Sequence, residues 1–229
     1  YLKIKNGLEI HTDGDLPARS GLGSSSAFSA ALLLALQALK NKKILIKDLT
    51  KKTIYFEQEI LKENVGIQDQ IQTCNGGFNL LSINKNGDYR ILRVDNSSSL
   101  VKDISNKMLL LYTGELRTSS LIQKQNQNIS AEIRYKSLEN IAKIADKVKS
   151  KIINEDLSFY NFAEYLEESW EQKIKMLSES SKKDNLNHIY KKAKQEGALS
   201  GKLLGAGGGG FFIFFVEEKL QKSFIEKMK

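Results

Sequence analysis

The chain contains very little cysteine and proline, and its apolar runs are short. Its 229 residues include one cysteine and one proline. A single thiol, Cys74, cannot form an intrachain disulfide, so we expect a reducing, cytoplasmic location in which Cys74 is inert. No apolar run approaches the roughly 18 residues needed to cross a membrane, and no signal-peptide pattern opens the sequence. We therefore expect no membrane partner.

Arginine is also scarce, although the net charge is +8, from 35 Lys and Arg against 27 Asp and Glu. The lysines are spread over expected helices, as at Lys143, Lys147 and Lys151. A nucleic-acid surface typically has clustered arginine interleaved with aromatic side chains, so we predict no nucleic-acid partner. The positive surplus suits small anionic ligands. With 41% hydrophobic and 27% charged residues, the chain can form a packed core.

Residues 17–27 form the most informative stretch of the sequence. Gly21 and Gly23 stand one residue apart, and three serines follow before an apolar helical run. Glycine lets the backbone approach a ligand closely, and a helix N-terminus attracts anions. The stretch has no lysine and has Ser26 where a third glycine would stand, which excludes the Walker A and Rossmann patterns. It predicts a phosphate-binding loop, or more simply a helix capped by Ser24 or Ser25.

Residues 205–210 are a second glycine-rich stretch. They contain the pattern G-x-G-x-x-G, but an apolar strand is expected to follow at residues 211–216, whereas the dinucleotide-binding pattern opens a helix. Apolar segments flank the stretch closely, so a flexible linker is also unsuitable. The small residues allow close approach of the backbone to a ligand.

Both stretches resemble signatures of the GHMP kinases, a family that includes galactokinase, homoserine kinase and mevalonate kinase. The first matches Pro, spacer, Gly-Leu-Gly-Ser-Ser-x-Ala, and the second matches Lys-x-x-Gly-Ala-Gly-Gly-Gly-Gly-Phe. No segment matches the family's first signature. Because the chain opens at Tyr1 without an initiator Met, we expect a fragment. The resemblance implies ATP binding by Pro17, Arg19, Gly21, Leu22, Gly23, Ser24, Ser25, Ser26, Ala27, Gly207 and Gly208.

The resemblance also gives roles to two acidic residues. Asp69, in Gly-x-x-Asp-Gln, matches the proposed base for the sugar hydroxyl in the galactokinase branch, although an isolated Asp usually forms a turn. Glu57 has the spacing of the family's magnesium-binding Glu, and Ser25 is the implied second magnesium ligand. Glu59 lies two residues further along the helix and faces elsewhere. The alternative for Glu57 is a solvated surface side chain.

The segment at residues 112–117 bears on the substrate. It reads Tyr-Thr-Gly-Glu-Leu-Arg and resembles bacterial heptose-phosphate kinases within the family. The resemblance implies ATP-dependent phosphorylation of the anomeric hydroxyl of D-glycero-D-manno-heptose 7-phosphate by a monomer or homodimer. The alternatives are a galactose or fucose kinase, or a truncated nucleotide-binding relative without catalysis. The implied substrate-binding residues are Asp69, Gly114, Arg117 and Gly208.

The order of expected elements predicts an α+β fold with mostly antiparallel sheets. The polar break at residues 96–99 suggests domains at 1–100 and 101–229. The resemblance implies an N-terminal sandwich of the ribosomal-protein type that lacks its first strands, and a ferredoxin-like C-terminal domain. Residues 65–70 are expected to be a loop, and Ile141, Ile144, Ala145, Val148 and Ile152 a buried stripe. Strands are expected at residues 1–10, 77–83, 89–93, 108–112 and 211–216, of which 108–112 is expected to be buried. Helices are expected at residues 24–39, 119–151, 161–178 and 186–195 and at the C-terminus. A further helix is expected to begin with Asp48 as its N-cap.

Overall fold

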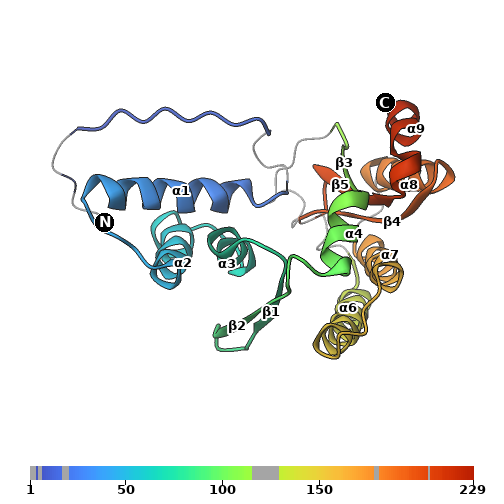
Figure 1. Cartoon of the computed structure of the whole chain (residues 1–229), viewed down its shortest axis with the longest axis horizontal. Helices are drawn as coiled ribbons and strands as arrows, with labels where there is room; N and C mark the ends of the chain where they lie inside the picture. The colour runs from blue at the N-terminus through green and yellow to red at the C-terminus, as the bar shows by residue number, and fades with distance from the viewer. Residues whose placement is uncertain (1–3, 5–6, 17–20, 115–128, 178–180, 206) are drawn as a thin grey trace. The chain divides into compact units, whose positions relative to one another are not determined.

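The computed structural model describes residues 4, 7–16, 21–114, 129–177, 181–205 and 207–229 (Figure 1). The chain divides into two compact units. The first comprises Tyr1–Ala18 and Gly23–Ile91, and the second Arg19–Leu22 and Leu92–Lys229. The mixture of helices and strands confirms the α+β class, and the boundary at residue 100 stays a prediction. Within the described residues, no helix is both long and apolar enough to span a membrane.

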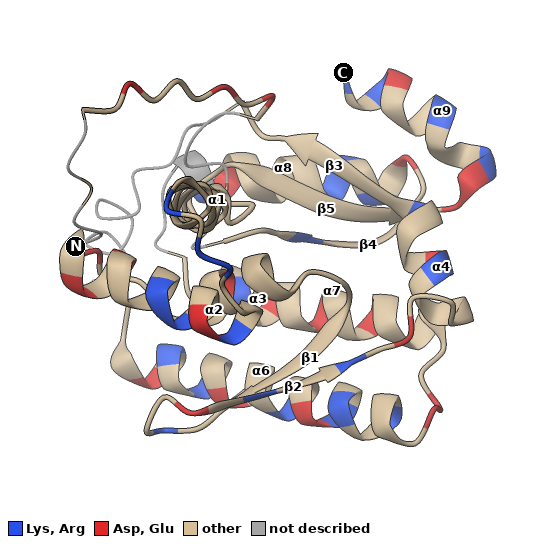
Figure 2. Cartoon of the chain, turned by 60° about the vertical axis from the view of Figure 1, so that its left-hand side comes forward, with Lys and Arg blue, Asp and Glu red and all other residues tan. Residues whose placement is uncertain are grey.

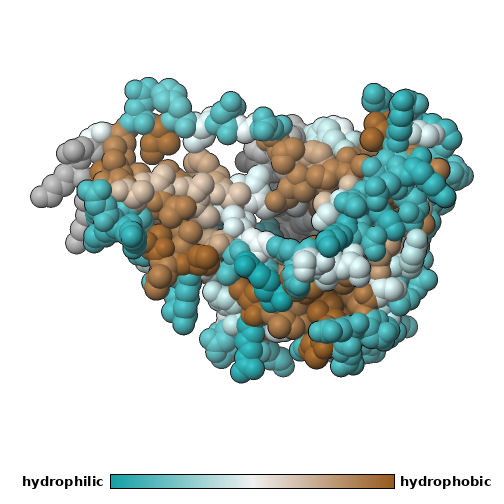
Figure 3. All heavy atoms as spheres, in the orientation of Figure 1, coloured by the Kyte–Doolittle hydropathy of each residue, from teal (hydrophilic) through white to brown (hydrophobic). Residues whose placement is uncertain are grey.

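The first unit is a helical cluster followed by a hairpin. Leu33, Leu49 and Ile71 are buried, one from each of its three packed α-helices. α1 also carries exposed apolar residues, including Phe28 and Leu34, and Figure 3 shows hydrophobic surface along it. The elements are α1 (Ser24–Leu39), α2 (Ile46–Tyr55), the π-helical turn η1 (Phe56–Ile60), α3 (Gln68–Asn75), β1 (Asn79–Ile83) and β2 (Tyr89–Arg93).

Three expectations for this unit are wrong. Residue 4 and residues 7–10 form no strand, because Leu8 and Ile10 are exposed and have no sheet to join. α2 begins at Ile46 after Leu45, so Asp48 lies within its first turn and does not cap it. α3 begins at Gln68, so residues 68–70 of the expected loop are helical. The helix at residues 24–39 and the strand at residues 89–93 are confirmed with their limits. The hairpin is also confirmed, but its first strand begins at Asn79 and not at residue 77.

The second unit packs helices against a three-stranded sheet of order β3-β5-β4, in which β5 is antiparallel to both neighbours. Trp170, Phe212 and Phe214 lie in its core. The Trp170 and Phe212 rings pack edge to face, with their centroids 5.2 Å apart. Figure 2 shows basic and acidic residues interleaved along α6 and α9. The elements are α4 (Ser99–Lys107), β3 (Met108–Tyr112), α6 (Ala131–Ile153), α7 (Phe159–Lys175), α8 (Ser181–Gln195), β4 (Ala198–Leu203), β5 (Phe211–Val216) and α9 (Glu218–Met228).

α4 and β4 are not predicted from the sequence. The polar break before α4 is a helix cap, because the Ser98 Oγ accepts a hydrogen bond from the Val101 N–H at 3.4 Å. β3 is an edge strand whose alternate side chains are exposed, so the expectation of a buried strand is wrong. In the expected stripe of α6, Ile144 is buried but Ala145 is exposed. Residues 119–128 of the longer helix expected at residues 119–151 lie outside the described residues.

Candidate active site

The first glycine loop leads into α1. Gly21 and Gly23 have φ angles of 86° and 72°, the left-handed region in which glycine is favoured. Gly23 is the N-cap, and its carbonyl accepts the Ala27 N–H at 2.9 Å. No side chain caps the helix, so the interpretation of Ser24 or Ser25 as a cap is wrong. The N–H groups of the first turn therefore lack intrahelical acceptors, as an anion site requires.

The other residues of this loop differ in exposure to solvent. Leu22 and Ser24 are half-buried, and Ser25 and Ala27 are exposed. Pro17 and Arg19 lie outside the described residues. The ATP-binding role of this loop stays a prediction.

A buried polar cluster lies behind the start of α1. Ser26 from α1 donates its hydroxyl to the Glu57 Oε2 at 3.0 Å, and Gln70 from α3 donates its amide to the same oxygen. Glu57, in η1, is 2% exposed, and Ser26 and Gln70 are 4% and 1% exposed. The Glu57 Oε1 has no hydrogen-bond partner among the described residues. Glu57 is therefore not the solvated side chain of the alternative interpretation.

The chemistry of this cluster suits a hard divalent cation. A buried carboxylate oxygen without a partner is costly, and a cation with oxygen ligands would satisfy it. Glu59 instead is exposed and forms an ion pair with Lys62 at 3.1 Å. In the part of the chain described, no three His, Cys, Asp or Glu side chains gather into a metal site.

The structure brings Ser26, and not the neighbouring Ser25, against Glu57. Ser25 is exposed at the first turn of α1. Its role as a magnesium ligand stays a prediction. The contact of Gln70 with Glu57 is not predicted from the sequence, although Gln70 flanks Asp69 in the motif.

Asp69 lies beside the first glycine loop. It is exposed in the first turn of α3, where the helix dipole favours a negative charge. A Cβ built on Gly23 would lie 3.9 Å from the Asp69 Cγ and 3.9 Å from the Thr73 Oγ1. Asp69, the predicted base, and Gly23, at the start of α1, are thus neighbours within the first unit.

The second glycine loop joins β4 to β5. Gly207, Gly209 and Gly210 have φ angles of 106°, 121° and 98°, and residues 207–210 are buried. A Cβ on Gly207 would lie 2.8 Å from the Leu177 Cδ2, so the position has no room for a side chain. The strand that follows confirms that this is no dinucleotide-binding motif. Binding by Gly207 and Gly208 stays a prediction.

Lys202 and the end of β3 complete the surroundings of this loop. Lys202, in β4, donates to the Ser169 Oγ at 2.8 Å, and burial lowers the pKa of its ammonium group. Gly114, after β3, is exposed with φ 78°. Arg117 lies outside the described residues.

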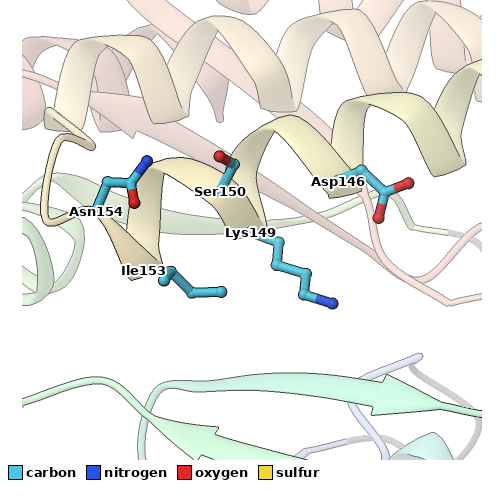
Figure 4. Close-up of a pocket in the computed structure, with 5 residues that line it drawn as sticks. All are labelled: Asp146, Lys149, Ser150, Ile153 and Asn154. Atoms are coloured by element: carbon cyan, nitrogen blue, oxygen red, sulfur yellow. The ribbon is translucent and has the colours of Figure 1, made fainter.

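A surface hollow on α6 contains none of the predicted site residues. Figure 4 shows its lining side chains, which all come from the end of that helix and the residue after it. One helix face encloses too little of a ligand to form a specific site, so this hollow is not a candidate site. The lining residues are Asp146, Lys149, Ser150, Ile153 and Asn154.

Comparison with known proteins identifies the family. Residues 1–77 match the GHMP kinases N-terminal domain and residues 153–229 the GHMP kinases C-terminal domain. The D-glycero-alpha-D-manno-heptose 7-phosphate kinase of Campylobacter jejuni is 31% identical, over 100% of this chain and 67% of the relative. The galactokinase of Clostridium beijerinckii is 28% identical, over 99% and 65%.

A solved structure gives the same answer for the fold. The mevalonate kinase of Methanococcus jannaschii superimposes with a TM-score of 0.72 at 22% identity, over 94% of this chain and 63% of that one. The chain thus spans about two thirds of the length of these relatives. The matching domains and the relative from Campylobacter jejuni show that this chain belongs to the GHMP kinases.

Proposed function

We propose that the chain acts as an ATP-dependent sugar kinase that phosphorylates the anomeric hydroxyl of D-glycero-D-manno-heptose 7-phosphate. The observation that carries this proposal is the position of Asp69 beside the Gly23 loop, next to the buried Glu57 cluster. Phosphoryl transfer needs an anion cradle, a means of neutralising charge and a group to accept the hydroxyl proton. The residues that we propose for these roles include Gly23, Glu57 and Asp69, which all belong to the first unit.

Each part has a residue to perform it. The sugar hydroxyl oxygen attacks the γ-phosphorus, its proton passes to the Asp69 carboxylate, and ADP leaves. The loop amides at the start of α1 hold phosphate oxygens. Glu57, with Ser25, would hold magnesium, which when bound neutralises charge on the transferring phosphate.

The choice of sugar is the finer part of the proposal. It is supported by the relative that is 31% identical and by the Tyr-Thr-Gly segment at the end of β3. Galactose is the second candidate, because a galactokinase is 28% identical over nearly the whole chain. Fucose remains the third sugar to test.

The test is a turnover assay with ATP and heptose 7-phosphate, galactose, fucose or mevalonate, applied to wild type, Asp69→Asn and Asp48→Asn. Asp48 is the matched control, an exposed Asp in the first turn of α2. We expect Asp69→Asn to lower kcat about 10²–10⁴-fold on the preferred sugar, while Asp48→Asn leaves it unchanged.

Three results would contradict the proposal in different ways. Equal kcat in both variants and wild type would remove Asp69 as the base. A preference for galactose would replace the heptose phosphate. Binding of ATP without turnover of any acceptor would favour a nucleotide-binding relative without catalysis.

A further inference from the structure

The second glycine loop is held at both ends by side chains that lie outside it. At the entry, the Lys173 Nζ of α7 donates to the carbonyl oxygens of Leu203, at 2.8 Å, and Gly205. At the exit, the Thr113 Oγ1 donates to the Gly210 carbonyl at 3.0 Å and accepts the Gly210 N–H at 3.1 Å. The Thr113 N–H also donates to that carbonyl, at 2.9 Å.

These contacts lie where the hydrogen-bonded pairing of β4 with β5 ends. The β4–β5 register ends at the pair Leu203 and Phe212, followed by a bond from the Leu204 N–H to the Phe211 carbonyl at 2.9 Å. Glycine has the largest backbone freedom of any residue, so a glycine loop costs much entropy to order. A loop that binds phosphate well is ordered before the phosphate arrives.

The two contacts also differ in chemistry. Lys173 bonds two backbone carbonyl oxygens, and its Cε would lie 3.7 Å from a Cβ on Gly207. Thr113 is neutral and buried, and it immediately precedes Gly114, a residue predicted to bind the sugar.

We propose that Lys173 and Thr113 are positioning residues that hold the glycine loop in its phosphate-binding conformation, and that Thr113 couples this loop to Gly114, the residue predicted to bind the sugar. The inference rests on the proposed function for its ligands, ATP and a sugar phosphate. It predicts that each ligand raises the affinity for the other, because both stabilise one arrangement around Thr113. Such coupling is reciprocal.

The test compares Thr113→Val with Thr113→Ser, and Lys173→Met with Lys173→Arg. Thr113→Val keeps the shape but removes both hydroxyl bonds, and Thr113→Ser restores them. We expect Thr113→Val and Lys173→Met to raise the Kd and KM for ATP about tenfold, with a smaller change in kcat. Thr113→Ser and Lys173→Arg should recover most of the loss, and Thr113→Val should reduce the mutual effect of ATP and sugar on affinity.

Matched controls separate positioning from general stability. Thr50 is a buried threonine whose hydroxyl bonds the Ile46 carbonyl of its own helix, and Lys143 is an exposed lysine paired with Glu139. Thr50→Val and Lys143→Met should leave the ATP affinity unchanged. Amide hydrogen exchange of residues 205–210, measured without ligand, should quicken in Thr113→Val and Lys173→Met but not in the controls.

The two proposals fail in distinguishable ways. Faster loop exchange in the variants, with a wild type that phosphorylates no sugar, overturns the function and leaves the positioning role standing. Unchanged exchange and unchanged ATP affinity in variants of an active enzyme overturn the positioning role. An equal loss in the serine and valine variants of Thr113 does so as well, because the hydroxyl would then be irrelevant.

Discussion

The two glycine loops use the same residue for different physical reasons. Gly23 needs a left-handed backbone, but a Cβ there would meet nothing closer than 3.9 Å. Gly207 also has a positive φ, and its Cβ would meet Leu177 at 2.8 Å. The first loop is thus constrained by conformation alone, and the second by conformation and packing.

Their surroundings differ in the same way. The first loop opens a helix and has carboxylates around it, at Asp69 and Glu57. The second lies buried between two strands, with Leu177 against it and Lys173 and Thr113 at its ends. We propose that the first loop carries the chemistry of phosphoryl transfer, and that packing orders the second loop. Substitution of a loop glycine should therefore reduce stability more in the second loop than in the first.

The largest effect is expected from Glu57→Gln, beside the first loop. Removing the charge weakens the binding of a divalent cation. We therefore expect kcat at a fixed magnesium concentration to fall by at least about 10²-fold, which corresponds to an activation barrier higher by about 3 kcal/mol. The free energy of unfolding should not fall, because an incompletely paired buried charge is removed.

The measurement is kcat as a function of magnesium concentration, together with urea unfolding. Glu59→Gln, in the same turn but exposed, is the matched control and should behave as wild type. Identical magnesium dependence in the two variants would contradict this prediction, because Glu57 would then have only a structural role.

The next effect tests the packing of the second loop. Gly207→Ala should lower the free energy of unfolding by about 3 kcal/mol, from backbone strain and overlap with Leu177. Gly23→Ala should cost about 1–2 kcal/mol, from backbone conformation alone. Urea unfolding measures both.

A second variant isolates the overlap. Adding Leu177→Ala to Gly207→Ala should recover about 1 kcal/mol beyond the sum of the single effects. Equal costs at Gly23 and Gly207, or strict additivity with Leu177, would mean that packing does not distinguish the loops.

A smaller effect separates the neighbouring serines of the first loop. Ser26→Ala removes a buried hydrogen bond to Glu57 and should lower the free energy of unfolding by about 1 kcal/mol. Ser25→Ala, at an exposed position, should change it by less than about 0.5 kcal/mol but reduce activity at low magnesium. If only Ser26→Ala alters the magnesium dependence, Ser26 and not Ser25 is the metal-linked serine.

The smallest effect concerns Lys202 and its dependence on pH. Burial lowers the pKa of Lys202, so between that pKa and the ordinary 10.5 the unfolded chain binds this proton more readily than the native one. The free energy of unfolding of the wild type, relative to that of Lys202→Met, should therefore increase as pH rises through this window, by less than about 1 kcal/mol. A difference that is constant with pH would mean that Lys202 titrates as an exposed lysine.

The sequence predicts elements whose ends carry strong local signals. The limits of α1 follow from Gly23 at its start and the Lys and Asn residues at its end, and the hairpin follows from its turn. Two glycine motifs suffice to predict the family. These signals are local, so they can be read without knowing what packs against them.

The rest depends on tertiary contacts. Gln68, Asp69 and Gln70 look like a turn, but burial of Gln70 and Ile71 stabilises a helix there. β4 is hard to recognise because Gly201 and Lys202 interrupt its apolar pattern. The glycine is explained by tertiary contacts, because a Cβ on Gly201 would overlap the Phe214 ring and the Ile213 carbonyl oxygen. The contact between Gln70 and Glu57 joins residues whose sequence spacing carries no such signal.

The π-helical turn after α2 limits the evolution of chain length. Its wider turn, closed by the Leu61 N–H on the Phe56 carbonyl at 2.9 Å, holds one residue more than a regular α-helical turn. Deleting a residue there would rotate the flanking side chains by about 100° relative to each other and turn Glu57 away from Ser26. Insertions and deletions should therefore be absent from this turn among active relatives, while the hairpin turn at residues 84–88 varies freely in length.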